Sequence, residues 1–217
     1  TTFTDHNMSG DISIRVCLGT GGIAAGGNAV LAAFQKELAA AAFTASFGSR
    51  CSAEKVGCRG LCAKDVLVDV VIDGITTTYA FVTSDMVKRI IAEHIIGGAP
   101  VAEWTVSEDY HSFLDKQMKV VLADCGIVNP ESIASYCNRG GYSAAQKALT
   151  TMTPDAVLAV IRAAGLRGRG GAGFSTALKW QTCRDADSSS KYLICNADEG
   201  DPGAFMDRAV LEGNPHS

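Results

Sequence analysis

A glycine-rich loop between two apolar stretches constrains the fold of this chain more than any other feature. Five glycines lie within Gly165–Gly173, in the run GLRGRGGAGF, together with Arg167 and Arg169. Because glycine lacks a Cβ, such a loop can bring backbone N–H groups close to a ligand and adopt positive φ without strain. The two arginines add positive charge, so the loop is predicted to bind an anion.

The sequences on both sides of the loop predict helices. The run TPDAVLAVIRAAG has helical spacing of its apolar residues, and Thr153 followed by Pro154 suits an N-cap and a first helical position. After the loop, FSTALKW is predicted to begin a second helix, whose N-terminus favours a phosphate group. A dinucleotide fingerprint, Gly168-x-Gly170-x-x-Gly173, is also present, but it has to follow a strand and here it follows a helix.

Two further interpretations of the loop are weaker. RGRGG resembles a fragment of an RNA-binding arginine–glycine segment, but such segments are repetitive, whereas this one occurs once in a chain of net charge −4. A plain interhelix turn needs neither so many glycines nor two arginines. An anion-binding loop between helices accounts for both the glycines and the arginines.

A second polar segment follows the predicted helices. Residues 191–195 form a short apolar run that predicts a buried strand, and it ends in Asn196 and Asp198. Polar groups at the carboxyl end of a strand are where α/β folds bind ligands. The Asn196 amide can both donate and accept at a heterocycle edge, and Asp198 can accept from its N–H. The run DEGDPG by itself is equally typical of an acidic turn.

Together the two segments resemble the NADH-binding flavoprotein subunit of bacterial respiratory complex I. The same family occurs in NAD-reducing hydrogenases, NAD-dependent formate dehydrogenases and benzoyl-CoA reductase complexes. The resemblance covers GLRGRGGAGF, ALKW, YLICNADEGDPG and the DRAVLE–PH tail. It implies FMN and NAD(H) as cofactors, with hydride transfer carried out by FMN and no catalytic side chain. The cofactor-binding residues that it implies are Gly168, Arg169, Gly170, Gly171, Ala172, Gly173, Phe174, Lys179, Asn196, Asp198, Glu199 and Asp201.

Within this set the resemblance assigns particular roles. Phe174 stacks near the nicotinamide, and the Lys179 ammonium favours the anionic form of the reduced flavin. Asp201 stands where the family has a glutamate with a longer side chain.

The first part of the chain is predicted to be a separate thioredoxin-like domain. Alternating apolar residues predict a strand over residues 12–16, and helical spacing predicts a helix over residues 28–41. The order strand–helix–strand–strand–helix is that of a thioredoxin-like fold. The remaining predicted elements are a strand over residues 43–47, a valine-rich strand after the cysteine loop, a partner strand over residues 75–82 and a helix over residues 85–96 capped by Ser84.

Cysteine spacing suggests an iron–sulfur site in this domain. Eight cysteines in a chain without a visible secretory signal indicate reduced thiols and metal ligation, not disulfides. Cys17 follows the first strand, and Cys58-x3-Cys62 lies on a later loop, an arrangement that suits iron because thiolates bind it well. The domain resembles the thioredoxin-like 2Fe–2S ferredoxin found in several subunits of the same family, where a fourth cysteine stands at the position of Gly22.

Two alternatives follow from Gly22. Cys51 supplies the fourth thiolate, or the cluster is lost and the domain is a structural remnant. The cysteines outside the site are predicted to be small buried residues; they are Cys125, Cys137, Cys183 and Cys195.

The sequence predicts an α/β chain in three parts. Residues 1–99 form the ferredoxin-like domain, residues 100–150 connecting helices, and residues 151–217 a truncated first part of the FMN/NADH-binding domain, because the family's subunits continue with a 4Fe–4S motif. No apolar run approaches the roughly 20 residues that span a bilayer, and no secretory signal is visible, so a cytoplasmic protein is predicted. A net charge of −4 argues against a nucleic-acid surface.

The predicted function is that of an NADH:acceptor oxidoreductase subunit, an FMN-dependent NADH dehydrogenase module of which the truncated part alone is predicted to be inactive. The subunit passes a hydride from NADH to FMN and single electrons to iron–sulfur clusters of a larger complex, whose partners include a small thioredoxin-like 2Fe–2S subunit. The alternative is a degenerate structural subunit of such a complex without redox activity of its own.

Overall fold

The computed structural model describes residues 11–217, which fold into two compact units. The first unit extends to Tyr136 and also includes Glu199–Ser217; the second is Cys137–Asp198. The division of the chain into three parts, with boundaries at residues 99 and 150, remains a prediction. Within the described part of the chain, no helix is long and apolar enough to cross a bilayer.

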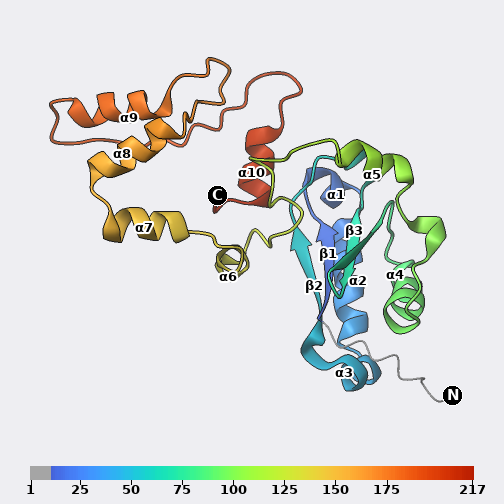
Figure 1. The fold of residues 1–217 in the computed structure, drawn as a ribbon. Helices are drawn as coiled ribbons and strands as arrows, with labels where there is room; N and C mark the ends of the chain where they lie inside the picture. The colour runs from blue at the N-terminus through green and yellow to red at the C-terminus, as the bar shows by residue number, and fades with distance from the viewer. Residues whose placement is uncertain (1–10) are drawn as a thin grey trace. The chain divides into compact units, whose positions relative to one another are not determined.

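A four-stranded mixed sheet forms the centre of the first unit (Figure 1). Its strands lie in the order β2-β1-β3-β4, with β1 parallel to β2 and antiparallel to β3, and β3 antiparallel to β4. Asp73 and Gly74 both have positive φ, as a two-residue hairpin between β3 and β4 requires. The strands are β1 (Ile12–Cys17), β2 (Cys51–Val56), β3 (Val68–Ile72) and β4 (Ile75–Tyr79).

One face of the sheet carries the apolar core. Side chains alternate along a strand, so Ile14 and Val16 of β1 point to the same face, where they are fully buried. Helix α2 (Gly27–Leu38) places Val30 and Phe34 in the same core, and helix α4 (Val87–Ile90), which continues as a π-helical segment over Ile91–Ile96, adds Ile90 and other apolar residues. The predicted thioredoxin-like α/β fold is confirmed.

Shorter helices connect and cover these elements. They are α1 (Thr20–Ala24), α3 (Ala41–Phe47), α5 (Glu108–Leu114), α6 (Ile133–Cys137) and α10 (Met206–Gly213), with single 3-10 turns at Gly48–Arg50, Cys62–Lys64 and Ala102–Trp104. Helix α10 belongs to the first unit although it comes last in the chain.

The predicted strand over residues 43–47 is wrong. These residues lie in helix α3, where Phe43 and Phe47, one helical turn apart, stack with ring centroids 4.5 Å apart. The second strand is β2, whose sequence CSAEKV alternates between exposed and less exposed positions. Its polar composition suits an edge strand. Because β2 contains no apolar run, the pattern of apolar residues did not predict it.

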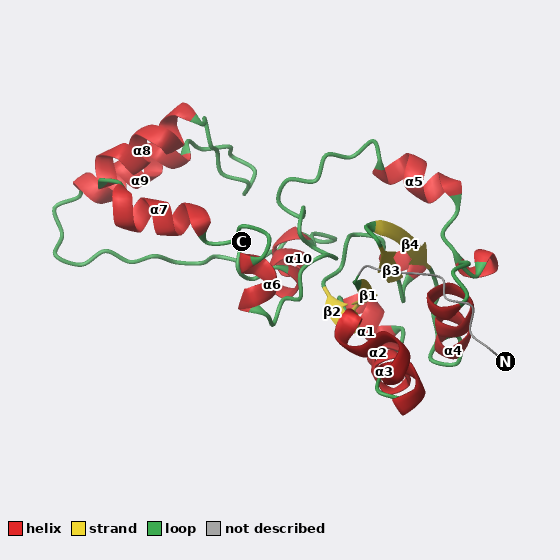
Figure 2. Ribbon diagram, turned by 60° about the horizontal axis from the view of Figure 1, so that its bottom comes forward, coloured by secondary structure: helices red, strands yellow, loops and turns green. Residues whose placement is uncertain are grey.

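The second unit is built around three helices: α7 (Ser143–Thr151), α8 (Pro154–Ala163) and α9 (Thr176–Asp185). Helices α8 and α9 lie side by side and are joined by the glycine-rich loop (Figure 2). The start of α8 confirms the predicted cap, because the Thr153 hydroxyl accepts a hydrogen bond from Ala156 N at 3.3 Å and Pro154 is the first helical residue. Arg184 of α9 forms an ion pair with Asp155 of α8.

Candidate functional sites

The glycine-rich loop is a short hairpin that leads from α8 into α9. Gly168 N donates to Phe174 O at 2.8 Å, and Thr176 N donates to Leu166 O at 3.0 Å. Three of the glycines, Gly165, Gly171 and Gly173, have positive φ, a conformation that other residues rarely adopt. These bonds close the base of the loop and leave its tip without contacts.

The tip of the loop is open to a ligand. A Cβ atom at Gly170 or Gly171 would meet nothing within 4 Å. Arg167 is used within the loop, since its Nη1 donates to Gly173 O at 2.9 Å. Arg169 is exposed and makes no hydrogen bond or ion pair with the described residues, so its guanidinium is available to an anion.

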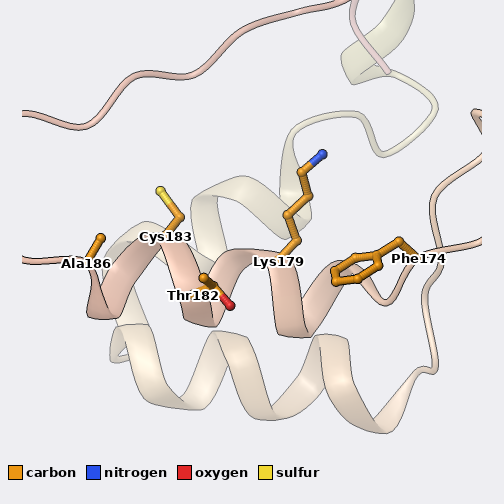
Figure 3. A pocket seen from close by; sticks show the side chains of 5 residues that line it. All are labelled: Phe174, Lys179, Thr182, Cys183 and Ala186. Atoms are coloured by element: carbon orange, nitrogen blue, oxygen red, sulfur yellow. The ribbon is translucent and has the colours of Figure 1, made fainter.

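A hollow lies against α9, next to the loop. It has a volume of about 520 Å³, and the residues that line it are Phe174, Lys179, Thr182, Cys183 and Ala186. Four of these recur at helical spacing along α9, and Figure 3 shows the Lys179 and Cys183 side chains pointing to the same side of the helix. Ser175 caps this helix by accepting from Leu178 N at 3.4 Å. The hollow therefore combines an apolar ring with an ammonium group.

The acidic segment after α9 lies in two different units. Asn196 and Asp198 belong to the same unit as the loop, where Asn196 Oδ1 accepts from Asp198 N at 3.1 Å in an Asx turn. Glu199 and Asp201 belong to the other unit. There the Glu199 carboxylate accepts from Asp207 N at 2.7 Å and from Arg208 N at 2.9 Å, and so it caps the start of α10. Its predicted role toward a flavin stays a prediction.

The predicted strand over residues 191–195 is wrong for this structure. Tyr192, Leu193 and Ile194 are 84%, 100% and 81% exposed and form no strand. A lone apolar segment has no backbone partners for its N–H and C=O groups, and within the described residues no strand pairs with it.

Three cysteines come together at one end of the sheet in the first unit. Cys17 ends β1, while Cys58 and Cys62 lie on the loop after β2 with their Sγ atoms 3.2 Å apart. Cys17 and Cys58 share a hydrogen bond, which raises the pKa of the Cys17 thiol and lowers that of Cys58 to about 5. Burial raises the pKa of Cys62 to about 11.

The corner does not have the geometry of a single-ion site. Across residues 11–217, no group of three or more His, Cys, Asp or Glu side chains is arranged to hold one metal ion. A two-iron cluster places its ligands around two metal atoms and needs a wider arrangement, so the thiols remain candidates for the predicted cluster.

The register of the sheet excludes Cys51 as the fourth ligand. Cys51 pairs with Ile12 at one end of β1, whereas Cys17 at the other end pairs with Val56. At about 3.3 Å per residue, five steps along the strand separate the two ends by roughly 16 Å. Of the two alternatives for the fourth ligand, the one that uses Cys51 therefore does not fit the register of the sheet.

Gly22 has no room for a side chain. It is buried in α1, and a Cβ atom there would lie 2.1 Å from the carbonyl oxygen of Cys17. The neighbouring Gly21 faces the cysteines, because a Cβ atom at that position would lie 3.5 Å from Cys62 Sγ and 2.8 Å from Asp65 Oδ2. Asp65 was missed in the sequence, although its spacing of three residues from Cys62 was the available signal.

A buried ion pair fixes the cysteine loop to the sheet. Arg59 Nη1 lies 2.7 Å from Asp69 Oδ2, and the Thr78 hydroxyl donates to Asp69 Oδ1 at 2.6 Å. Asp69 of β3 and Thr78 of β4 are paired in the sheet and project from the face opposite the apolar core. Since Arg59 directly follows Cys58, this pair determines where the loop lies.

The outlying cysteines differ from expectation in three cases of four. Cys125 is buried, as predicted, but the thiols of Cys137, Cys183 and Cys195 are exposed.

Comparison with protein families confirms the resemblance seen in the sequence. Residues 161–217 match the family model of the Nuo51 FMN-binding domain. Residues 1–94 match that of the thioredoxin-like [2Fe-2S] ferredoxin. The first match contains the glycine-rich loop, and the second contains Cys17, Cys58 and Cys62.

The chain is similar to subunits of two redox enzymes and to one solved ferredoxin structure. The chain is 52% identical over 102 residues to the HndC subunit of the NADP-reducing hydrogenase of Solidesulfovibrio fructosivorans, a match that covers 47% of this chain and 20% of that protein. It is 44% identical over 97 residues to a subunit of an NADH-quinone oxidoreductase of Rhizobium meliloti, covering 45% and 23%. These matches span about a fifth of the relatives' own lengths. The thioredoxin-like [2Fe-2S] ferredoxin of Aquifex aeolicus is similar in structure, with a TM-score of 0.40, 21% identity, and 46% of this chain and 93% of that chain covered.

Proposed function

We propose that this chain is part of an NADH-dependent electron-input module, which uses FMN to pass electrons from NADH to iron–sulfur clusters. The observation that carries the proposal is the glycine loop, closed at its base and open at its tip, beside Lys179 and within the segment that matches an FMN-binding domain. FMN, when bound, converts the two-electron hydride of NADH into single electrons, which iron–sulfur clusters accept. The protein itself needs no nucleophile or general acid for this reaction.

The glycine-rich loop, the hollow and the segment after α9 would each bind a different part of the cofactors. Backbone N–H groups at Gly170 and Gly171, with the Arg169 guanidinium, would bind the phosphate. The Lys179 ammonium would stabilise negative charge on the reduced ring, and Phe174, which is exposed, would offer its face to the nicotinamide. Asn196 and Asp198 would hydrogen-bond the edge of the flavin ring.

The proposal extends to partners and location. We place the module in the cytoplasm, in a complex with iron–sulfur subunits that include a small thioredoxin-like 2Fe–2S protein. The acidic balance of the chain is against nucleic acid as a partner. Two relatives, named as subunits of a hydrogenase and of a quinone oxidoreductase, support this setting.

A flavin titration tests the proposal. We expect the full-length protein that contains this chain to bind FMN, seen as quenching of flavin fluorescence, and its yellow absorbance to bleach when NADH is added. Lys179→Met should weaken FMN binding about ten- to a hundredfold, because it removes one charge-assisted contact of roughly 1.5–3 kcal/mol. Lys147→Met, on exposed α7 of the same unit, is the matched control and should bind as the parent chain does.

The opposite outcome has a definite meaning. If the parent chain and both variants bind no FMN, the module is a structural subunit without redox activity of its own. If Lys147→Met weakens binding as much as Lys179→Met, the charge of the unit and not the hollow beside α9 governs binding.

A further inference from the structure

We propose that Asp65 is the fourth ligand of a 2Fe–2S cluster in this chain, completing a site with Cys17, Cys58 and Cys62. The inference deepens the ferredoxin half of the proposed function and rests on it for the type of cluster. It assigns to a carboxylate the place that a cysteine would take at Gly22.

The three thiols converge from two separate loops. Cys58 and Cys62 are in direct contact at 3.2 Å, and Gly60 N also donates to Cys58 Sγ at 3.2 Å. Cys17 lies on the neighbouring strand end, within hydrogen-bonding reach of Cys58. Three ligands leave a 2Fe–2S cluster one short, because each of its two irons needs two from the protein.

Asp65 brings an unused donor atom to this corner. Its Oδ1 accepts from Leu67 N at 3.4 Å, which orients the carboxylate. Its Oδ2 is buried and lacks a well-formed hydrogen bond among the described residues, and the carboxylate lies close enough to Cys17 to raise the pKa of that thiol. A buried carboxylate oxygen without a partner is costly in free energy, and a metal ion removes that cost.

Gly21 and Gly22, in the segment after β1, explain why the Asp65 carboxylate can lie at this position. The space that a side chain at Gly21 would fill is taken by Asp65 Oδ2 and by the Cβ of Cys62, at 2.8 and 3.0 Å from the missing Cβ. At Gly22 a side chain would collide with the backbone of Cys17. The loop therefore excludes a thiol of its own and admits the carboxylate from the opposite loop.

The charge and chemistry of a carboxylate suit this role. Aspartate carries the same single negative charge as the thiolate that it would replace, so the total charge of the ligand set is unchanged. Oxygen is a good donor to iron, and biological 2Fe–2S clusters with non-cysteine ligands on one iron are known. Arg59, which directly follows Cys58, is paired with Asp69 and does not compete for Asp65.

Anaerobic reconstitution of the full chain with ferrous iron and sulfide tests the inference. We expect the parent chain to retain iron and sulfide in equal amounts and to show visible sulfur-to-iron absorption. After reduction with dithionite it should give the electron paramagnetic resonance signal of a reduced 2Fe–2S cluster. Asp65→Ala should retain on the order of tenfold less iron, since even the loss of a group that only supports a ligand weakens metal sites by 10–100-fold.

Two variants keep the test decisive. Asp65→Cys should retain iron, with its absorption and resonance spectra shifted because sulfur replaces oxygen at one iron. Asp73→Asn, in the exposed β3–β4 turn, is the matched control and should load as the parent chain does. If Asp65→Ala fails to fold, as judged by circular dichroism, the spectral shift of Asp65→Cys alone decides.

Several results would overturn the inference. The inference is wrong if the parent chain takes up no cluster. It is also wrong if Asp65→Ala retains full iron with an unchanged spectrum, or if Asp65→Cys has the same spectrum as the parent chain. Because FMN binding is measured separately, a chain that binds FMN without a cluster refutes this site and leaves the flavin proposal standing. A chain that loads a cluster but binds no FMN supports this site and refutes the flavin proposal.

Discussion

At the scale of single residues, His94 is buried beside the Tyr79 hydroxyl. Tyr79 Oη lies 3.0 Å from His94 Nδ1 and accepts a hydrogen bond from Val101 N at 3.1 Å. Burial lowers the pKa of His94 below its ordinary value of 6.5. The contact with Tyr79 depends on the packing of the π-helical segment Ile91–Ile96 against the sheet, so it could not be predicted from the sequence.

This arrangement predicts a loss of stability in mild acid. Below about pH 6.5 the unfolded chain binds a proton at His94 that the folded chain does not bind, so the free energy of unfolding falls as the pH falls through 6.5 toward the lower folded pKa. The slope from this residue is at most about 1.4 kcal/mol per pH unit. Urea unfolding at several pH values should show a shallower slope for His94→Gln than for the parent chain. His111→Gln, at an exposed position, is the control, and an equal slope in all three proteins would contradict the prediction.

At the scale of elements, the pair of Arg59 and Asp69 joins the cysteine loop to β3. Both side chains are largely buried, so removing one leaves the charge of the other without a partner. We expect Asp69→Ala to lower the free energy of unfolding by about 3–5 kcal/mol, as for other broken buried ion pairs. Chemical denaturation measures this, with Asp187→Ala in an exposed loop of the second unit as the control. A loss similar to that of the control would mean that the pair does not hold the loop.

Elements with strong periodicity were predictable, and those that depend on partners were not. The alternation of β1, the valine-rich run of β3 and the Thr153 cap of α8 each follow from local physics, and the structure has them. The sequence of helix α3 also fits a strand, because Phe43 and Phe47 lie on one face in either conformation. Residues 191–195 have the apolar composition of a strand, but a strand also needs a neighbour to bond with.

The candidate sites show the same difference between local features and features that depend on partners. The glycine-rich loop and the three cysteines could be identified from residue types and spacings, because glycine freedom and thiolate chemistry are local properties. The exclusion of Cys51 came from strand register, and the presence of Asp65 came from the meeting of two loops. Neither could be obtained from the order of residues along the chain.

At the scale of the whole molecule, the end of the chain returns to its first domain. Thr20 Oγ1 donates to Glu212 at 3.2 Å, and the rings of Tyr136 and His216 stack 5.6 Å apart. Within the first unit, α10 thus lies against the loops that carry the cysteines (Figure 1). Residues almost the full length of the chain apart contribute to one packed unit.

The closest point of this contact is between two glycines and can be tested. A Cβ atom at Gly57 would lie 2.2 Å from Gly213 Cα, where only backbone is available to move. We expect Gly57→Ala to lower the free energy of unfolding by about 1–3 kcal/mol, as overpacking does elsewhere, and to expose α10 to limited proteolysis. Gly170→Ala is the stability control, because its Cβ would meet nothing within 4 Å. Since Gly57 precedes Cys58, a displaced α10 should also reduce iron retention after reconstitution. Unchanged stability and an unchanged cleavage pattern for Gly57→Ala would mean that the end of the chain does not pack against the cysteine loop.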